Sequence, residues 1–322
     1  MMRAKARYTI QARALIYWGW IVLAGLLAGC GQPAFGASPT PPAPPSAYPN
    51  GTLLITAPQL AAELGDTQLR LLDARPLHAY NAGHIPGARH AWWQDTIEVH
   101  NDIYGMLTGE TGRAALVQAW GIRPGVHVVV YDDEGGRDAA RILWVLHVLG
   151  FRAVQILDGG WQAWQAANLP ITRTVPLSSS AGDWPVSQLD YRVLIGAEDV
   201  LRIVQTHSAL IIDDRTPAER DETWNGQLRR GHIPGAIHWP WDQLFTPGPI
   251  PFIRPPHELQ AELAALGITP DRPIVVYGLD GPHAAIAYLA FTLLGYPSVR
   301  VYDGSWAQWG SSKSTMPVEL SQ

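Results

Sequence analysis

The hexapeptide GHIPGA at residues 83–88 returns unchanged at residues 231–236, 148 positions later. Three further pairs of motifs keep the same order at offsets of 140 to 148: LLDAR at 71–75 and IIDDR at 211–215, VVVY at 128–131 and IVVY at 274–277, LDGGWQAW at 157–164 and YDGSWAQW at 302–309. A fixed order of motifs at a nearly constant offset indicates a duplicated unit. The sequence therefore predicts two consecutive domains of the same fold.

Each copy alternates short apolar runs of strand length with segments of helical period. In the first copy, His127–Tyr131 has strand length and Ala139–Leu149 carries apolar residues on one helical face. The second copy repeats this order with Pro273–Tyr277 and Ala284–Leu294. Strands that read as continuous apolar runs between helices are typical of a parallel sheet covered on both faces. Each copy is therefore predicted to be an α/β domain.

Composition and charge exclude several classes of protein. The chain has 322 residues, of which 47% are hydrophobic and 16% charged, so it is long and apolar enough for two folded domains. With 23 basic and 28 acidic side chains the net charge is -5, which predicts no nucleic-acid partner. A single cysteine excludes a disulfide framework and a Cys-rich zinc site. The 11 histidines show no HxxxH or HExxH spacing, so neither a metal nor another cofactor is predicted.

The N-terminus has the composition of an export signal. Four basic residues lie within the first 13 positions, and residues 14–29 carry no charge and are too few for a typical membrane-spanning helix. The run ends in Leu-Ala-Gly at residues 27–29, followed by Cys30, which resembles the bacterial lipoprotein box. The resemblance implies a signal peptide over residues 1–29 and a lipid on Cys30. The alternative is a plain signal anchor with an incidental cysteine.

Export and a lipid on Cys30 predict a protein anchored to the bacterial cell envelope, on its periplasmic or extracellular face. The membrane would then be a partner through the lipid. Removal of residues 1–29 leaves 19 basic and 28 acidic side chains, a net charge of -9. Residues 31–50 contain seven prolines and no charged side chain, so residues 30–50 are expected to form an extended tether.

The motifs together resemble a known family. The series DAR, GHIPGA, VVVYDDEGG and LDGGW in the first copy, and DDR, GHIPGA, VVYG and YDGSWAQWG in the second, is similar to the tandem-domain rhodaneses, the thiosulfate and 3-mercaptopyruvate sulfurtransferases. The resemblance covers nearly all of residues 51–322. It implies two domains, each a five-stranded parallel sheet flanked by helices, over residues 51–175 and 191–322, with a linker at 176–190. The first domain of this family is usually inactive.

The resemblance also places the active loop, in which a cysteine takes a sulfur atom as a persulfide and passes it to a nucleophile. Carried over residue by residue, this cysteine falls on Gly278, which has no nucleophile. In the first copy, Asp132 stands at the equivalent position. The loop is expected to lie at the carboxyl end of a strand, before a helix N-terminus that favours an anion. Its six residues are Gly278, Leu279, Asp280, Gly281, Pro282 and His283.

Positive charge for a bound anion is expected from a small set of residues. The substrate-contacting arginine of the family would fall on Glu219, where a carboxylate would repel thiosulfate or mercaptopyruvate. The remaining candidates for anion binding are Arg220, Arg229, Arg230 and His283. Surface charge without a role is an equally good interpretation of the three arginines.

Other duplicated residues favour structural roles. The pairs Asp73–Arg75 and Asp213–Arg215 occur in both copies, which favours an ion pair that braces each domain. His84 and His232 of the GHIPGA motifs are expected to form hydrogen bonds within a turn. The tryptophans after each Asp-Gly turn are expected to pack against the loops. The carboxylates of residues 132–134 are adjacent in a tight loop and cannot converge on one metal ion.

Three hypotheses for function follow. The first is a lipid-anchored rhodanese-like protein whose sulfurtransferase site is degenerate and which binds an anion, such as a small sulfur oxyanion, or a protein partner. The second is an active thiosulfate or 3-mercaptopyruvate sulfurtransferase that works without a thiol in its own loop, for example with a partner's thiol. The third is a purely structural surface lipoprotein.

Overall fold

The computed structural model describes residues 42–176, 181–221, 223 and 225–320. The predicted signal peptide and Cys30 lie outside these residues. Within the described ranges, no helix combines the length and the apolar character that crossing a membrane requires.

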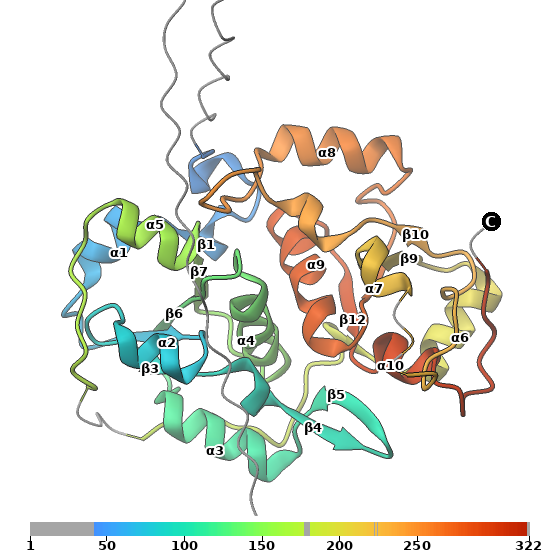
Figure 1. Cartoon of the computed structure of the whole chain (residues 1–322), viewed down its shortest axis with the longest axis horizontal. Coiled ribbons are helices and arrows are strands. Elements are labelled where there is room, and N and C mark those ends of the chain that lie inside the picture. Colours follow the sequence, from blue (N-terminus) through green and yellow to red (C-terminus); the bar gives the residue numbers. More distant parts are fainter. Residues whose placement is uncertain (1–41, 177–180, 222, 224, 321–322) are drawn as a thin grey trace, which may run out of the picture. The chain divides into compact units, whose positions relative to one another are not determined.

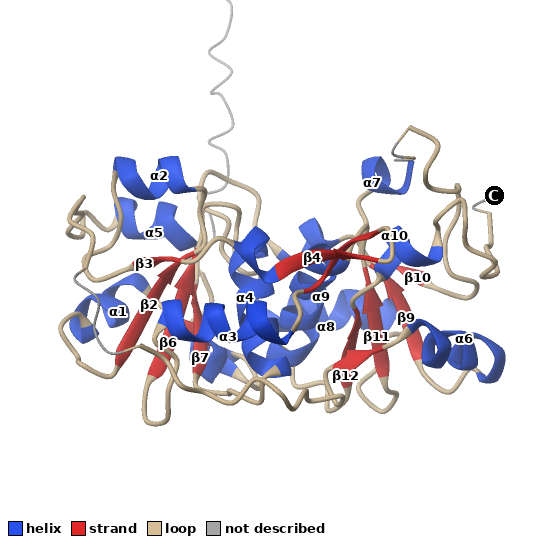
Figure 2. Ribbon diagram, turned by 90° about the horizontal axis from the view of Figure 1, so that it is seen from below, coloured by secondary structure: helices blue, strands red, loops and turns tan. Residues whose placement is uncertain are grey.

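The first domain is built around a five-stranded parallel sheet with the strand order β1-β7-β6-β2-β3. Helices flank this sheet on both faces (Figure 2). The strands are β1 (Leu54–Ile55), β2 (Leu69–Asp73), β3 (Arg89–His90), β6 (His127–Tyr131) and β7 (Val154–Leu157). The helices are α1 (Ala57–Glu63), α2 (Leu77–Ala82), α3 (Glu110–Trp120), α4 (Arg137–Val148) and α5 (Gly160–Ala166).

The second domain repeats this architecture with the strand order β10-β9-β11-β12-β8 (Figure 1). Its strands are β8 (Leu194–Ile195), β9 (Leu210–Asp213), β10 (Ile237–His238), β11 (Ile274–Tyr277) and β12 (Val299–Tyr302). Its helices are α6 (Ala197–Thr206), α7 (Pro217–Asp221), α8 (Pro256–Ala265), α9 (Gly281–Leu293) and α10 (Ser305–Trp309). The two five-stranded parallel sheets confirm the predicted fold.

The central strands and the helices α4 and α9 form the main core. The side chains of Val128, Val130, Ile274 and Val276 are completely buried, as expected for parallel strands covered on both faces. Helices α4 and α9 pack against each other and are apolar around most of their circumference. The two helices thus join the domains through one continuous core.

An antiparallel hairpin, formed by β4 (Ile97–His100) and β5 (Ile103–Leu107), was not predicted from the sequence. It belongs to the first domain but reaches the second. A Cβ atom added to Gly105 would lie 2.9 Å from Cβ of Asp280, in the second-domain loop. The hairpin is missing from the duplicated motifs, so the repeat could not reveal it.

The last residues of the expected tether are part of the folded unit. Tyr48 is 4% exposed, and its hydroxyl donates a hydrogen bond to the backbone oxygen of Arg254 at 2.9 Å. The side-chain amide of Asn50 donates to the carbonyl of Thr292 at 2.7 Å, at the C-terminal end of α9. The folded part of the chain therefore begins before residue 51, because Tyr48 and Asn50 find partners in the second domain.

The expected linker also packs on the fold where it is described. The backbone N–H of Gly182 donates to the carbonyl of Gln118, and the indole N–H of Trp184 donates to the carbonyl of Leu149. The Trp184 ring meets the edge of Phe151 at 5.1 Å between ring centroids. These contacts fix the second half of the linker on the first domain.

Candidate functional site

The duplicated Asp-x-Arg motif forms a buried ion pair at the end of β2 and β9. The Arg75–Asp73 contact is 2.6 Å, and the Arg215–Asp213 contact is 2.8 Å. Each guanidinium lies over the ring of the tryptophan that follows the Asp-Gly turn of its own domain, at 4.0 Å and 4.4 Å. These contacts confirm the bracing role predicted for the motif and the packing role predicted for the tryptophans.

The histidines of the GHIPGA motifs form hydrogen bonds, as predicted. His84 contacts the carbonyls of Tyr80 and Thr174 through its two ring nitrogens. His232 contacts Arg220 through Nδ1 at 3.1 Å and Glu319 through Nε2 at 3.7 Å. The predicted hydrogen bonds form, but each ring also contacts a residue distant in sequence, Thr174 or Glu319, and so is not confined to its own turn.

The second-domain loop, Gly278 to His283, follows β11 and includes the first three residues of α9. Two backbone hydrogen bonds anchor it to α10: the N–H of Trp306 donates to the carbonyl of Gly278 at 3.0 Å, and the N–H of Ala307 donates to the carbonyl of Leu279 at 2.8 Å. Asp280 caps α9, since its side chain accepts from the N–H of His283 at 3.3 Å. A carboxylate of the chain thus already lies where a helix N-terminus would attract an anion.

In the first-domain loop, Asp132 fills the centre with its own carboxylate. Its two oxygens accept hydrogen bonds from the backbone N–H groups of Glu134, Gly136 and Ala139 at 2.7 to 3.0 Å. Burial and the nearby Asp138 nevertheless raise the pKa of Asp132. The first loop is therefore a ring of amides occupied by a side chain of the same loop.

In the second domain the equivalent position, Gly278, has no side chain, and Asp214 lies against it. A Cβ atom at Gly278 would be 2.7 Å from Oδ1 of Asp214 and 2.9 Å from Cβ of His283. Asp214 is fully buried, and neither of its oxygens has a hydrogen-bond partner among the described residues. Burial, together with Glu219 and Asp213, raises the pKa of Asp214 well above its usual range. The surroundings of Asp214 therefore disfavour its charged form.

His283 lies between two carboxylates at the mouth of this loop. Its Nδ1 is 2.5 Å from Oδ1 of Asp280, and its Nε2 is 3.6 Å from Oε1 of Glu219. Burial lowers the pKa of His283, but Asp280 and Glu219 outweigh it, so that the pKa lies above its ordinary value. The two carboxylates therefore favour the protonated form of the ring, which lies between Asp280 and Glu219.

The space beside His283 is small and lies between the domains. It has a volume of about 20 Å³, enough for about one water molecule. First-domain residues form most of its wall, including Arg137 and Arg141. Nη2 of Arg141 is buried and has no hydrogen-bond partner among the residues that the structure describes. A thiosulfate ion does not fit this cavity.

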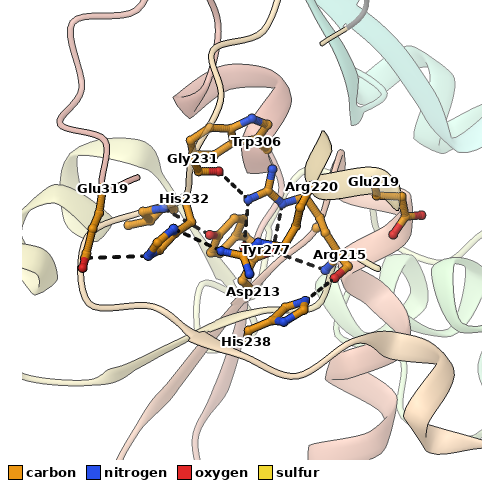
Figure 3. A network of polar contacts seen from close by, with 12 residues as sticks. Asp213, Arg215, Glu219, Arg220, Gly231, His232, His238, Tyr277, Trp306 and Glu319 are labelled. Atoms are coloured by element: carbon orange, nitrogen blue, oxygen red, sulfur yellow. Dashed lines mark hydrogen bonds and ion pairs between the residues drawn. The ribbon is translucent and has the colours of Figure 1, made fainter. Parts of the chain in front are cut away.

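The predicted anion-binding residues do not form one site. Arg215 and Arg220 converge on Asp213, with Nε of Arg220 at 3.4 Å from the carboxylate (Figure 3). Arg229 donates to the carbonyls of Trp309 and Met316, and Arg230 is exposed. The arginines beside His283 are instead Arg137 and Arg141 of α4. Arg137 lies near the end of the first-domain loop, at the start of α4. Its position in the sequence does not indicate that it faces the second domain.

Each domain accepts hydrogen bonds from the other through the aspartate of its duplicated Asp-Gly turn. Asp303 accepts from the N–H of Leu107 in the hairpin at 2.6 Å and from Arg141 in α4 at 2.8 Å. In the first domain, Asp158 accepts from the N–H of Ile253 in the second domain at 3.1 Å. The duplicated aspartates therefore hold the domains together reciprocally, a role that the sequence did not reveal.

Two similar parallel sheets, each with a loop between its central strand and a helix N-terminus, define the class as a tandem α/β domain protein. A sequence model of the rhodanese-like domain matches residues 56–167 and 196–312. The chain therefore belongs to the rhodanese family.

The chain resembles sulfurtransferases along most of its length. It is 34% identical over 275 residues to a thiosulfate sulfurtransferase of Azotobacter vinelandii, covering 83% of this chain and 97% of the relative. It is 32% identical over 286 residues to a 3-mercaptopyruvate sulfurtransferase of Escherichia coli, covering 83% and 98%. The crystal structure of a 3-mercaptopyruvate sulfurtransferase from Escherichia coli superimposes with a TM-score of 0.70 at 30% identity, covering 79% of this chain and 98% of that one.

Proposed function

We propose that this chain is a catalytically degenerate member of the sulfurtransferase superfamily, which acts as a binding module at the bacterial cell envelope. The observation that carries the proposal is Gly278 at the position where the family resemblance places the nucleophilic cysteine. Persulfide chemistry needs a thiolate that attacks the sulfane sulfur of the donor. The single cysteine of the chain is Cys30, in the N-terminal segment, so the loop has no thiol of its own.

The charges around the loop argue against a small sulfur oxyanion as the ligand. Asp280 and Glu219 each contact His283, and Asp214 takes the space next to Gly278. Arg137 and Arg141 beside His283 are paired with Asp138 and Asp303, so the mouth of the loop has no surplus positive charge. A cavity of about 20 Å³ adds a steric argument against a polyatomic anion.

A protein partner fits the remaining surface better. An open groove of about 670 Å³ runs between the hairpin and the second domain, beside the loop. Val99 and Tyr104 of the hairpin contribute exposed apolar surface to it, and Leu228 and Ala307 form part of the opposite wall. The exposed Lys313–Asp102 ion pair at 2.9 Å crosses from one wall to the other and contributes little stability. We therefore favour a protein over a small anion as the ligand of this module.

Turnover assays test the proposal. Because residues 41–322 form one compact unit, the protein can be made without the N-terminal segment. We expect no transfer of sulfur to cyanide above background from either thiosulfate or 3-mercaptopyruvate, since the loop lacks a thiolate. The 3-mercaptopyruvate sulfurtransferase of Escherichia coli serves as the positive control. Robust turnover by the unmodified protein would contradict the proposal and favour an enzyme that works without a thiol in its own loop.

Membrane attachment is tested on the full chain. If Cys30 carries a lipid, Cys30→Ser removes the thioether and blocks maturation, so we expect the protein to shift from processed, lipid-labelled material to unlabelled precursor. Metabolic labelling with a radioactive fatty acid measures this directly. Equal labelling of the Cys30→Ser variant and the unmodified chain would show that Cys30 is not the acylated residue.

A further inference from the structure

A buried carboxyl group lies at the start of each loop, but it comes from a different position in the two copies. In the first domain, the residue after β6 is Asp132 and the middle residue of the Asp-x-Arg motif is Ala74. In the second domain, the residue after β11 is Gly278 and the middle residue of the motif is Asp214. The larger side chain therefore stands after the central strand in the first copy and in the middle of the Asp-x-Arg motif in the second.

The backbone shows that these positions are equivalent. The N–H of Ala74 donates to the carbonyl of Tyr131 at 2.8 Å, and the N–H of Asp214 donates to the carbonyl of Tyr277 at 3.0 Å. Both tyrosines are the last residues of their strands, next to the loop. The strand register agrees, since the aspartates before Ala74 and Asp214 pair with these tyrosines in both sheets. The exchange is thus a change of side chains on a backbone that the two copies share.

The burial of Asp214 needs an explanation. A buried carboxyl without a hydrogen-bond partner is unfavourable relative to a satisfied one, so such groups are rare in folded proteins. An alanine, as in the first copy, would avoid this penalty but would leave a void beside Gly278. Close packing in protein interiors makes a void unfavourable as well. The carboxyl therefore acts here through its volume.

We propose that Asp214 and Gly278 are an exchanged pair, in which the Asp214 side chain fills the room of the missing loop side chain and thereby excludes any larger residue, including a cysteine, from position 278. This inference rests on the proposed function, because it explains why the degenerate loop has no side chain at position 278. Loss of the thiol is then not the only obstacle to sulfur transfer at position 278. A side chain restored there would contact Oδ1 of Asp214.

A double-mutant cycle on residues 41–322 tests the exchange. Gly278 does not have a positive φ angle, so alanine is sterically allowed there by the backbone and only the neighbours oppose it. We expect Gly278→Ala alone to lower the melting temperature by about 3–8 °C, as overpacking of a buried site does. In the Asp214→Ala background the same substitution is expected to lower the melting temperature less, because the contact with Oδ1 of Asp214 is gone while those with Cβ of His283 and the backbone N of Ala284 remain.

The first copy offers a matched control for the exchange. There, Ala74→Asp places a second carboxyl beside Asp132 and is expected to lower the melting temperature, whereas adding Asp132→Gly restores part of the loss. If Gly278→Ala does not fold, recovery of folding in the Gly278→Ala, Asp214→Ala variant gives the same information. A thiol probe provides a second readout: in the chain from residue 41, a cysteine at position 278 should react faster with a thiol reagent when residue 214 is alanine.

Additive effects would overturn the inference. If Gly278→Ala changes the melting temperature equally with Asp214 and with alanine at position 214, the two residues do not compete for space. Sulfur transfer by the unmodified protein would contradict the proposed function but would leave the result of this stability cycle unaffected. The two failures can therefore be told apart.

Discussion

The substitution Arg141→Met is expected to lower the free energy of unfolding by about 3–5 kcal/mol, because it leaves the buried Asp303 carboxylate without its cation. Nη1 of Arg141 is 2.8 Å from Oδ1 of Asp303, and both side chains are almost completely inaccessible to solvent. Among the residues that the structure describes, Asp303 would retain only the side-chain hydrogen bond from the N–H of Leu107. Chemical denaturation of residues 41–322 measures the loss.

The second copy provides a control for Arg141→Met. The sequence Ala-Ala-Arg at 139–141 corresponds to Ala-Ala-Ile at 284–286, so Ile286 stands at the position of Arg141. An apolar side chain is thus compatible with this place in the helix when no paired carboxylate faces it. Asp303→Asn in the Arg141→Met background removes the uncompensated charge and should recover a large part of the loss. A loss below about 1 kcal/mol for Arg141→Met would show that the buried pair is not important for stability.

Asp158 is the first-domain counterpart of Asp303, and a substitution that removes its charge is expected to stabilise the protein. Burial raises the pKa of Asp158 to about 6, even though the N–H groups of Ile253 and Gly159 donate to it. A carboxyl whose pKa is higher in the folded state binds its proton more tightly there. Its contribution to stability is therefore complete below pH 4 and is lost as the pH rises through 6. The complete loss, from well below pH 4 to well above pH 6, is about 3 kcal/mol.

Asp158→Asn removes this loss, because asparagine keeps an oxygen that accepts from Ile253 but cannot ionise. We expect the variant to be more stable than the unmodified protein by up to about 3 kcal/mol at pH 7.5 and to show no gain at pH 4. Denaturation curves at the two pH values measure the difference. The equivalent substitution Asp303→Asn is the matched control and should destabilise the protein at pH 7.5, because Asp303 is paired with Arg141. Equal effects of Asp158→Asn at both pH values would refute this account of Asp158.

The repeat predicts the fold well because the duplicated motifs lie at the ends of the central strands. Apolar runs such as His127–Tyr131 are strands whose bounds agree with the prediction. The start of α9 lies three residues before the predicted Ala284, since Asp280 caps the helix and Pro282 occupies its first turn. The hairpin contacts the second-domain loop where Gly105 lies against Asp280. These residues are far apart in sequence and belong to no repeated motif, so the sequence did not predict the contact.

The candidate site was predicted only in part. The sequence placed the loop at Gly278–His283, and the structure finds that segment after β11 and in the first three residues of α9. Anion binding by His283, Arg220, Arg229 and Arg230 stays a prediction; the structure places Arg220 beside Asp213 and Arg229 against the C-terminal segment, and leaves Arg230 exposed. The importance of Asp214 depends on a distance of 2.7 Å across two strands, which the sequence alone does not provide.

The central claim is that this chain carries no sulfur on a residue of its own loop. The most direct measurement is the intact mass of residues 41–322 after incubation with thiosulfate or 3-mercaptopyruvate. The 3-mercaptopyruvate sulfurtransferase of Escherichia coli is treated identically. We expect the mass of this chain to stay unchanged while that of the control increases by one sulfur atom. A stoichiometric gain of one sulfur atom by the unmodified chain would contradict the account.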